Sequence, residues 1–63
     1  MCLSKVYEIR DGAENLLCEY VSGVDVSGDT VIFKDILGVE TSVRGAITSI
    51  DLVKNSIVIA AAE

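Results

Sequence analysis

Apolar and polar side chains alternate along almost the whole chain, and this period of two constrains the fold more than any other feature. Val, Ile and Thr make up nineteen of the 63 residues, and β-branched residues favour strands over helices. Turn-forming residues interrupt the apolar runs roughly every eight to twelve residues, as in small sandwiches and barrels. The pattern predicts an all-β protein, a small antiparallel barrel or sandwich of six or seven short strands.

The strands are expected where alternating runs lie between turn residues. These runs cover residues 3–9, 16–21, 24–26, 30–36, 39–43, 47–53 and 57–61. In the first run, Leu3, Tyr7 and Ile9 share one face, with Lys5 as the exception, and this face is predicted to be apolar.

Three interruptions have a predicted geometry. Ser22-Gly23 is expected to form a bulge or bend, and Gly45 a corner. Asn55 suits a left-handed turn position between the last two strands. Residues 13–20 also show helical spacing, so a short helix remains an alternative there. The preceding Asp11-Gly12 favours a hairpin instead.

The length of the chain predicts one small domain, residues 1–63, with a marginal core. A chain of about 60 residues buries only roughly 60% of its unfolded surface, so it commonly needs oligomerisation, metal or disulfides. Two cysteines allow at most one bridge, and a homodimer is the expected remedy. The longest apolar run, residues 57–62, is far short of the ~20 residues that span a membrane. We therefore expect a soluble cytoplasmic protein without a membrane segment.

Charge and the absence of histidine exclude several functions. The net charge is −5, and the five cationic residues are scattered singly, whereas nucleic-acid binders carry a basic patch. Without histidine, the chain has no Ser/His or Cys/His pair, no imidazole base and no imidazole metal ligand. The sequence therefore predicts a protein that is not an enzyme, and it disfavours nucleic-acid binding.

The two cysteines are the remaining candidates for metal chemistry. Cys2 follows the initiator Met1, and removal of Met1 would expose an α-amine and a thiolate that form a five-membered chelate. Such N/S sets suit Ni²⁺, although a terminal cysteine can also be inert. Cys18 lies within a predicted strand, where a buried cysteine acts as a small apolar side chain. A disulfide with Cys2 or a role as second ligand are its alternatives.

Carboxylates and aromatic residues give weaker indications. Asp25 and Asp29 flank a glycine turn, but the spacing of a calcium-binding loop is absent. The three aromatic residues, Tyr7, Tyr20 and Phe33, resemble the base-stacking residues of some small barrels, yet without cationic neighbours they are expected in the core.

The opening Met1-Cys2-Leu3-Ser4-Lys5-Val6-Tyr7 resembles that of the CooT family, as do the closing Ile47-x-x-Ile50-Asp51-Leu52 and Ile57-Val58-Ile59. The resemblance covers essentially the whole chain, and its most specific part is the Met-Cys opening. It implies a homodimeric, SH3-like β-barrel that acts as a nickel chaperone in the maturation of carbon monoxide dehydrogenase. The metal-binding cysteine of the family falls on Cys2, and Cys18 is not part of the shared pattern.

The HypC hydrogenase-assembly chaperones also begin with Met-Cys, but they normally continue with a Gly-x-Pro-Gly-like stretch. This chain has Ser4-Lys5-Val6-Tyr7 there and contains no proline. The sequence therefore predicts a nickel-binding accessory protein with Cys2 as metal ligand, Ni²⁺ as cargo and a nickel enzyme as client. A HypC-like assembly chaperone and a small module of the predicted RNA-binding type are the alternatives.

Overall fold

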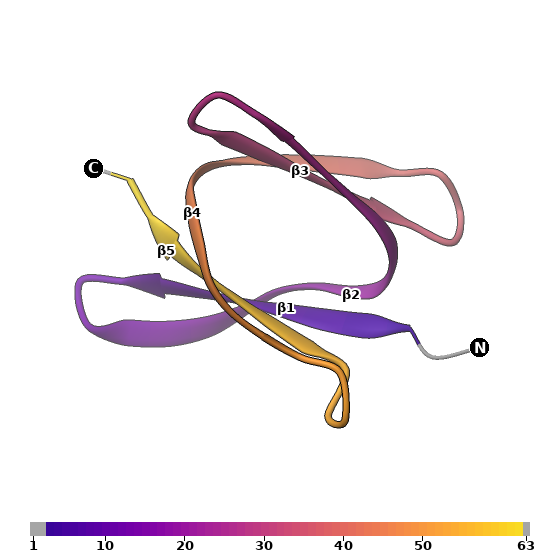
Figure 1. Ribbon diagram of the computed structural model, residues 1–63, viewed down its shortest axis with the longest axis horizontal. Helices are drawn as coiled ribbons and strands as arrows, with labels where there is room; N and C mark the ends of the chain where they lie inside the picture. Colours follow the sequence, from indigo (N-terminus) through magenta and orange to yellow (C-terminus); the bar gives the residue numbers. More distant parts are fainter. Residues whose placement is uncertain (1–2, 63) are drawn as a thin grey trace.

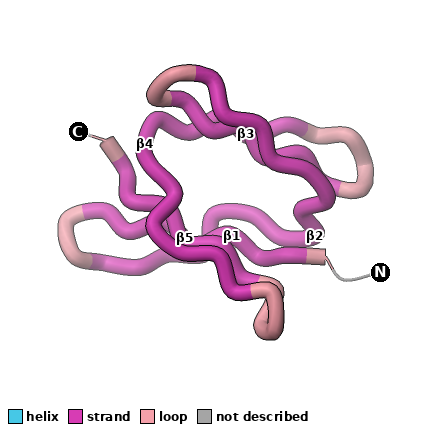
Figure 2. Tube along the Cα trace, in the orientation of Figure 1, coloured by secondary structure: helices cyan, strands magenta, loops and turns pink. Residues whose placement is uncertain are grey.

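The alternating runs form strands throughout the computed structural model, which describes residues 3–62 (Figure 1). The five strands are β1 (Ser4–Arg10), β2 (Ala13–Ser27), β3 (Thr30–Asp35), β4 (Glu40–Asp51) and β5 (Ser56–Ala61). Figure 2 shows only strands and connecting turns over these residues. No helix capable of crossing a membrane occurs in this part of the chain.

The strands close into a barrel in the order β1-β2-β3-β4-β5. Consecutive strands pair antiparallel, and β1 and β5 complete the ring as a parallel pair. Closure removes the open edges that would otherwise expose unpaired backbone groups. The predicted small all-β barrel is therefore confirmed.

The predicted number of six or seven strands is wrong, because two strands are each shared between two neighbours. β2 pairs with β1 up to Val21 and with β3 from Val21 onward. Similarly, β4 pairs with β3 up to Arg44 and with β5 from Gly45 onward. The expected interruptions at Ser22-Gly23 and Gly45 are therefore places where a continuous strand changes partner. A register shift between Val21 and Gly23 confirms the predicted bulge.

The turn predictions agree with the backbone. Residues 13–20 lie in β2, so the hairpin is confirmed and the helical alternative is wrong. Asp11 and Gly12 form the turn, with φ angles of 52° and 77°. Asn55 has a φ of 54°, the left-handed conformation expected between β4 and β5. Short polar side chains tolerate this conformation because they hydrogen-bond locally.

The core lies inside the barrel and consists of aliphatic side chains around one aromatic ring. Its buried members are Val6, Val21, Val31, Phe33, Val43, Ile57 and Ile59. In β1 the fully buried residue is Val6, whereas Tyr7 and Ile9 are half-buried, as is Leu3 just before the strand. Register shifts relative to β2 occur on both sides of Val6. Such irregularities break the strict alternation of inward and outward side chains along the strand.

Candidate functional site

Cys2, the predicted nickel ligand, lies outside the described residues. The described residues begin with Leu3 and Ser4, and β1 starts at Ser4. β2 and β5 flank this end of β1, because Ser4 pairs with Val21 and Lys5 pairs with Ser56.

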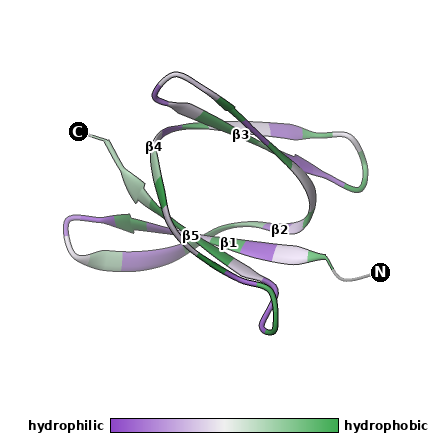
Figure 3. Ribbon diagram, viewed as in Figure 1, coloured by the Kyte–Doolittle hydropathy of each residue, from purple (hydrophilic) through white to green (hydrophobic). Residues whose placement is uncertain are grey.

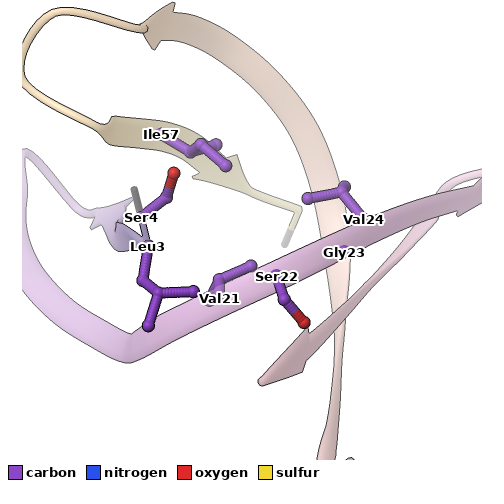
Figure 4. A pocket seen from close by; sticks show the side chains of 7 residues that line it. All are labelled: Leu3, Ser4, Val21, Ser22, Gly23, Val24 and Ile57. Atoms are coloured by element: carbon purple, nitrogen blue, oxygen red, sulfur yellow. The ribbon is translucent and has the colours of Figure 1, made fainter. Parts of the chain in front are cut away.

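A pocket of about 230 Å³ lies beside the first described residues (Figure 4). Its lining comes from the start of β1, the bend of β2 and the start of β5: Leu3, Ser4, Val21, Ser22, Gly23, Val24 and Ile57. The lining is mainly apolar, with hydroxyls from Ser4 and Ser22, and none of these side chains is charged. The Ser22 hydroxyl donates to the Lys34 carbonyl at 3.4 Å. Such a lining can shelter an apolar group but provides no acid or base.

The bend of β2 forms one wall of this pocket. Tyr20 has a φ of 57°, a left-handed conformation that is uncommon for a bulky residue. Gly23 follows the bulge, and a Cβ there would meet nothing closer than the Lys34 Cβ at 3.9 Å. The strand thus turns from β1 towards β3 while Val21 stays buried.

The β4–β5 hairpin lies against the start of β1. The Lys5 amide donates to the Asn55 carbonyl at 2.9 Å. Oδ1 of Asp51 accepts the Val53 and Lys54 amides at 3.0 and 2.9 Å. The hydrogen bond from the Lys54 amide is the main reason that the pKa of Asp51 is lowered; the Val53 amide and the Lys54 charge act in the same direction. The side chain of Asp51 thereby orders the turn next to β1.

Cys18 lies in β2 opposite Val6 and packs against the core while remaining half-buried. Burial, and secondarily the charge of Asp35, raise the pKa of its thiol above the ordinary value. Metals bind the thiolate, so this environment disfavours Cys18 as a ligand. Its contacts agree with the prediction of an apolar packing role. Within residues 3–62, no three Cys, Asp or Glu side chains are grouped to hold a metal ion.

Several charged side chains are engaged in ion pairs. Arg44 contacts Asp29 at 3.1 Å, and Arg10 contacts Glu8 at 3.4 Å. Lys34 lies 3.8 Å from Glu40. Three of the five cations thus have carboxylate partners. Asp29, one of the two carboxylates considered for calcium, is bound to an arginine instead.

Two exposed apolar surfaces were missed by sequence reasoning. The first, the β3–β4 patch, consists of Tyr20, Ile36, Leu37 and Val39. Tyr20, expected in the core, is 59% exposed, whereas Phe33 is buried. The second, the β4–β5 tip, consists of Leu52 and Val53, which are 80% and 93% exposed. Both surfaces contain apolar residues within or beside turns, and turn position is the signal that could have revealed their exposure.

The fold places the protein among small closed β-barrels. A crystal structure described as that of a candidate CooT from Carboxydothermus hydrogenoformans has the same fold, with a TM-score of 0.87 and 18% sequence identity. The match covers 98% of this chain and 100% of the other. Residues 1–60 match the family described as CO dehydrogenase accessory protein CooT. The chain therefore belongs to the CooT family, as the resemblance in its opening residues predicted. A comparison with curated proteins finds no match.

Proposed function

We propose that this protein is a cytoplasmic, non-catalytic nickel chaperone that binds Ni²⁺ through Cys2 and delivers it to carbon monoxide dehydrogenase. The observation that carries the proposal is the family match over residues 1–60, which includes Cys2 and links the chain to a nickel enzyme. In this role Ni²⁺ is cargo, so the site must bind the ion and also release it.

The side chains available for nickel favour Cys2 over other ligands. The chain contains no histidine, and its only other cysteine, Cys18, has a raised thiol pKa. Glu8, a carboxylate towards the end of β1, is paired with Arg10. The thiolate of Cys2 is therefore the proposed ligand, since the other thiol and this carboxylate are both disfavoured.

The α-amine of Cys2 is the proposed second donor, available once Met1 is removed. Amine and thiolate in one five-membered ring, with backbone amides as further donors, provide the N/S set that suits Ni²⁺. Both donors must lose a proton, so nickel affinity is expected to increase as the pH rises. An uncleaved N-terminal extension separates the amine from the thiolate and should weaken binding or change the absorption spectrum of the complex.

The proposed chaperone acts as a homodimer. The core contains only seven buried residues in the described chain, and the β3–β4 patch leaves four large apolar side chains exposed. The Ile36 amide donates to the Tyr20 carbonyl at 3.1 Å, which joins β2 to the β3–β4 loop within this patch. Two-fold symmetry could also bring two chain starts together around one ion. Sedimentation of a stable, folded monomer at micromolar concentration would contradict this part of the proposal.

The deciding experiment is a nickel titration of the tag-free protein, followed by thiolate-to-nickel charge-transfer absorption. Cys2→Ala is expected to abolish this band and tight binding while the circular dichroism spectrum stays unchanged. Cys18→Ala is the matched control, because it removes the other thiol and should retain both the band and the affinity. If Cys18→Ala loses the metal while Cys2→Ala retains it, the proposed site is wrong.

A further inference from the structure

The β4–β5 tip presents two neighbouring apolar side chains to solvent. Leu52 and Val53 are 80% and 93% exposed, the two residues lie at the end of the hairpin, and Ile50 beside them is also exposed. Figure 3 shows hydrophobic and hydrophilic residues side by side at the turn of this hairpin. Exposed apolar pairs of this kind, when they lie at a projecting turn, are suited to enter a pocket on a partner.

Hydrogen bonds order the backbone of the tip. Asp51 accepts two amide hydrogen bonds across the turn, from Val53 and Lys54. Asn55 takes the left-handed conformation and binds the Lys5 amide at 2.9 Å, which fastens the turn to β1. A preordered loop loses little conformational entropy on binding, so two apolar side chains can contribute useful affinity.

The charges beside the tip indicate the kind of surface that it fits. Lys54 belongs to the same turn, and Lys5 is joined to it through Asn55. These two lysines form no ion pair within residues 3–62, although the Lys54 charge acts on Asp51. The other three cations are paired in a chain that carries ten acidic residues. The complementary surface is an apolar pocket with carboxylates at its rim.

The size of the tip favours a transient partner over a second copy of the chain. A stable interface buries about 800 Å² on each partner, and the few side chains of this tip cannot cover that area alone. The loop between β3 and β4 carries three of the four residues of the patch proposed for the homodimer, and it projects from a different part of the barrel than the β4–β5 hairpin (Figure 1). The tip therefore remains available when that patch is covered.

We propose that Leu52 and Val53 dock into an apolar, acid-rimmed pocket on the client enzyme that receives the nickel. This inference rests on the proposed chaperone function. Cys2 is three residues from Lys5, a reach of about 11 Å of extended chain. Because Lys5 is bound to the hairpin, docking of the tip keeps Cys2 close to the client and shortens the path for metal transfer.

The test measures binding to purified nickel-free carbon monoxide dehydrogenase from the same organism, by biolayer interferometry. The double variant Leu52→Ser/Val53→Ser should bind about tenfold more weakly or worse, because two apolar contacts are lost. Val53→Ser is compared with Val26→Ser, a matched control at an exposed position on β2 away from the tip. Val26→Ser should bind as the unchanged protein does. Lys54→Glu should weaken binding and reduce its dependence on salt.

Nickel titration and sedimentation of the same variants separate the possible failures. Retained nickel affinity with lost enzyme binding supports the docking tip. If the double variant binds the enzyme as well as the protein without substitutions does, the docking tip is wrong. It is also wrong if the double variant no longer forms a dimer, since the tip would then contact a second copy of the chain. If the protein without substitutions binds nickel but not the enzyme, the docking proposal is overturned while the proposed nickel binding stands. Failure of the unchanged protein to bind nickel refutes the chaperone function instead.

Discussion

Gly45 is the residue at which β4 leaves β3 and begins to pair with β5, and it tests how tightly the barrel closes. A Cβ at this position would overlap the Ala60 carbonyl oxygen and lie 3.2 Å from both the Ala60 carbonyl carbon and the Ala61 Cα. All three are backbone atoms of β5, so no side-chain rotation can relieve the contact. Gly45→Ala therefore requires β4 and β5 to separate where their pairing begins.

The magnitude follows from two opposing contributions. Overpacking against neighbours that cannot move costs about 3 kcal/mol, the upper part of the usual range. Alanine also restricts the unfolded chain, which returns about 0.5–1 kcal/mol. The expected net loss in the free energy of unfolding is about 2 kcal/mol. With a urea slope of about 1 kcal/mol/M for a small protein, the unfolding midpoint should fall by about 2 M.

The assay is urea unfolding followed by circular dichroism, at one fixed protein concentration because dimerisation would couple to folding. Gly23→Ala is the matched control, since a Cβ there meets only the Lys34 Cβ at 3.9 Å, an ordinary contact. Only the restriction of the unfolded chain should then act, so Gly23→Ala should gain about 0.5–1 kcal/mol and its midpoint should rise by about 0.5–1 M. Equal midpoints for the two variants would refute the close approach of β4 and β5 at Gly45.

Three further predictions concern individual side chains. Cys18→Ala should cost about 1 kcal/mol, measured by the same urea unfolding, because only a small cavity is left; a loss above about 3 kcal/mol would mean a larger packing role. Since the pKa of the Cys18 thiol is raised, its contribution to stability is complete below the ordinary thiol pKa and is lost as the pH rises through the raised value. Cys18→Ala should therefore flatten the fall in the free energy of unfolding at alkaline pH. An unchanged fall would refute this prediction. Since the pKa of Asp51 is lowered, its contribution to stability is present above the ordinary carboxyl pKa and is lost as the pH falls through the lowered value. Asp51→Ala should therefore reduce the amide-exchange protection of Val53 and Lys54 at neutral pH and remove the dependence of that protection on acid. Equal protection in both proteins would contradict the role of this carboxylate.

The sequence alone determined the strand content and most of the turns. β3 and β5 lie within or close to the runs predicted for them, because each is a short strand bounded by residues that favour turns. Asn55 took its left-handed conformation for a local reason, which is the short polar side chain. The absence of histidine limited the metal chemistry to cysteine, amine and carboxylate without reference to any fold. The family resemblance also depended on local sequence, and the match over residues 1–60 confirmed it.

Only the tertiary structure decided where the long strands change partners and which side chains face inward. Ser22-Gly23 and Gly45 read locally as breaks, but closure of the barrel lets the ladder continue through them with a new neighbour. The burial of Val6 depends on register shifts against β2, and the exposure of Tyr20 depends on the bend of that strand. Hydrophobicity does not distinguish an apolar residue in the core from one at a hairpin tip. Leu52 and Val53 are exposed because the barrel ends before the hairpin does, and this boundary exists only once all five strands have closed.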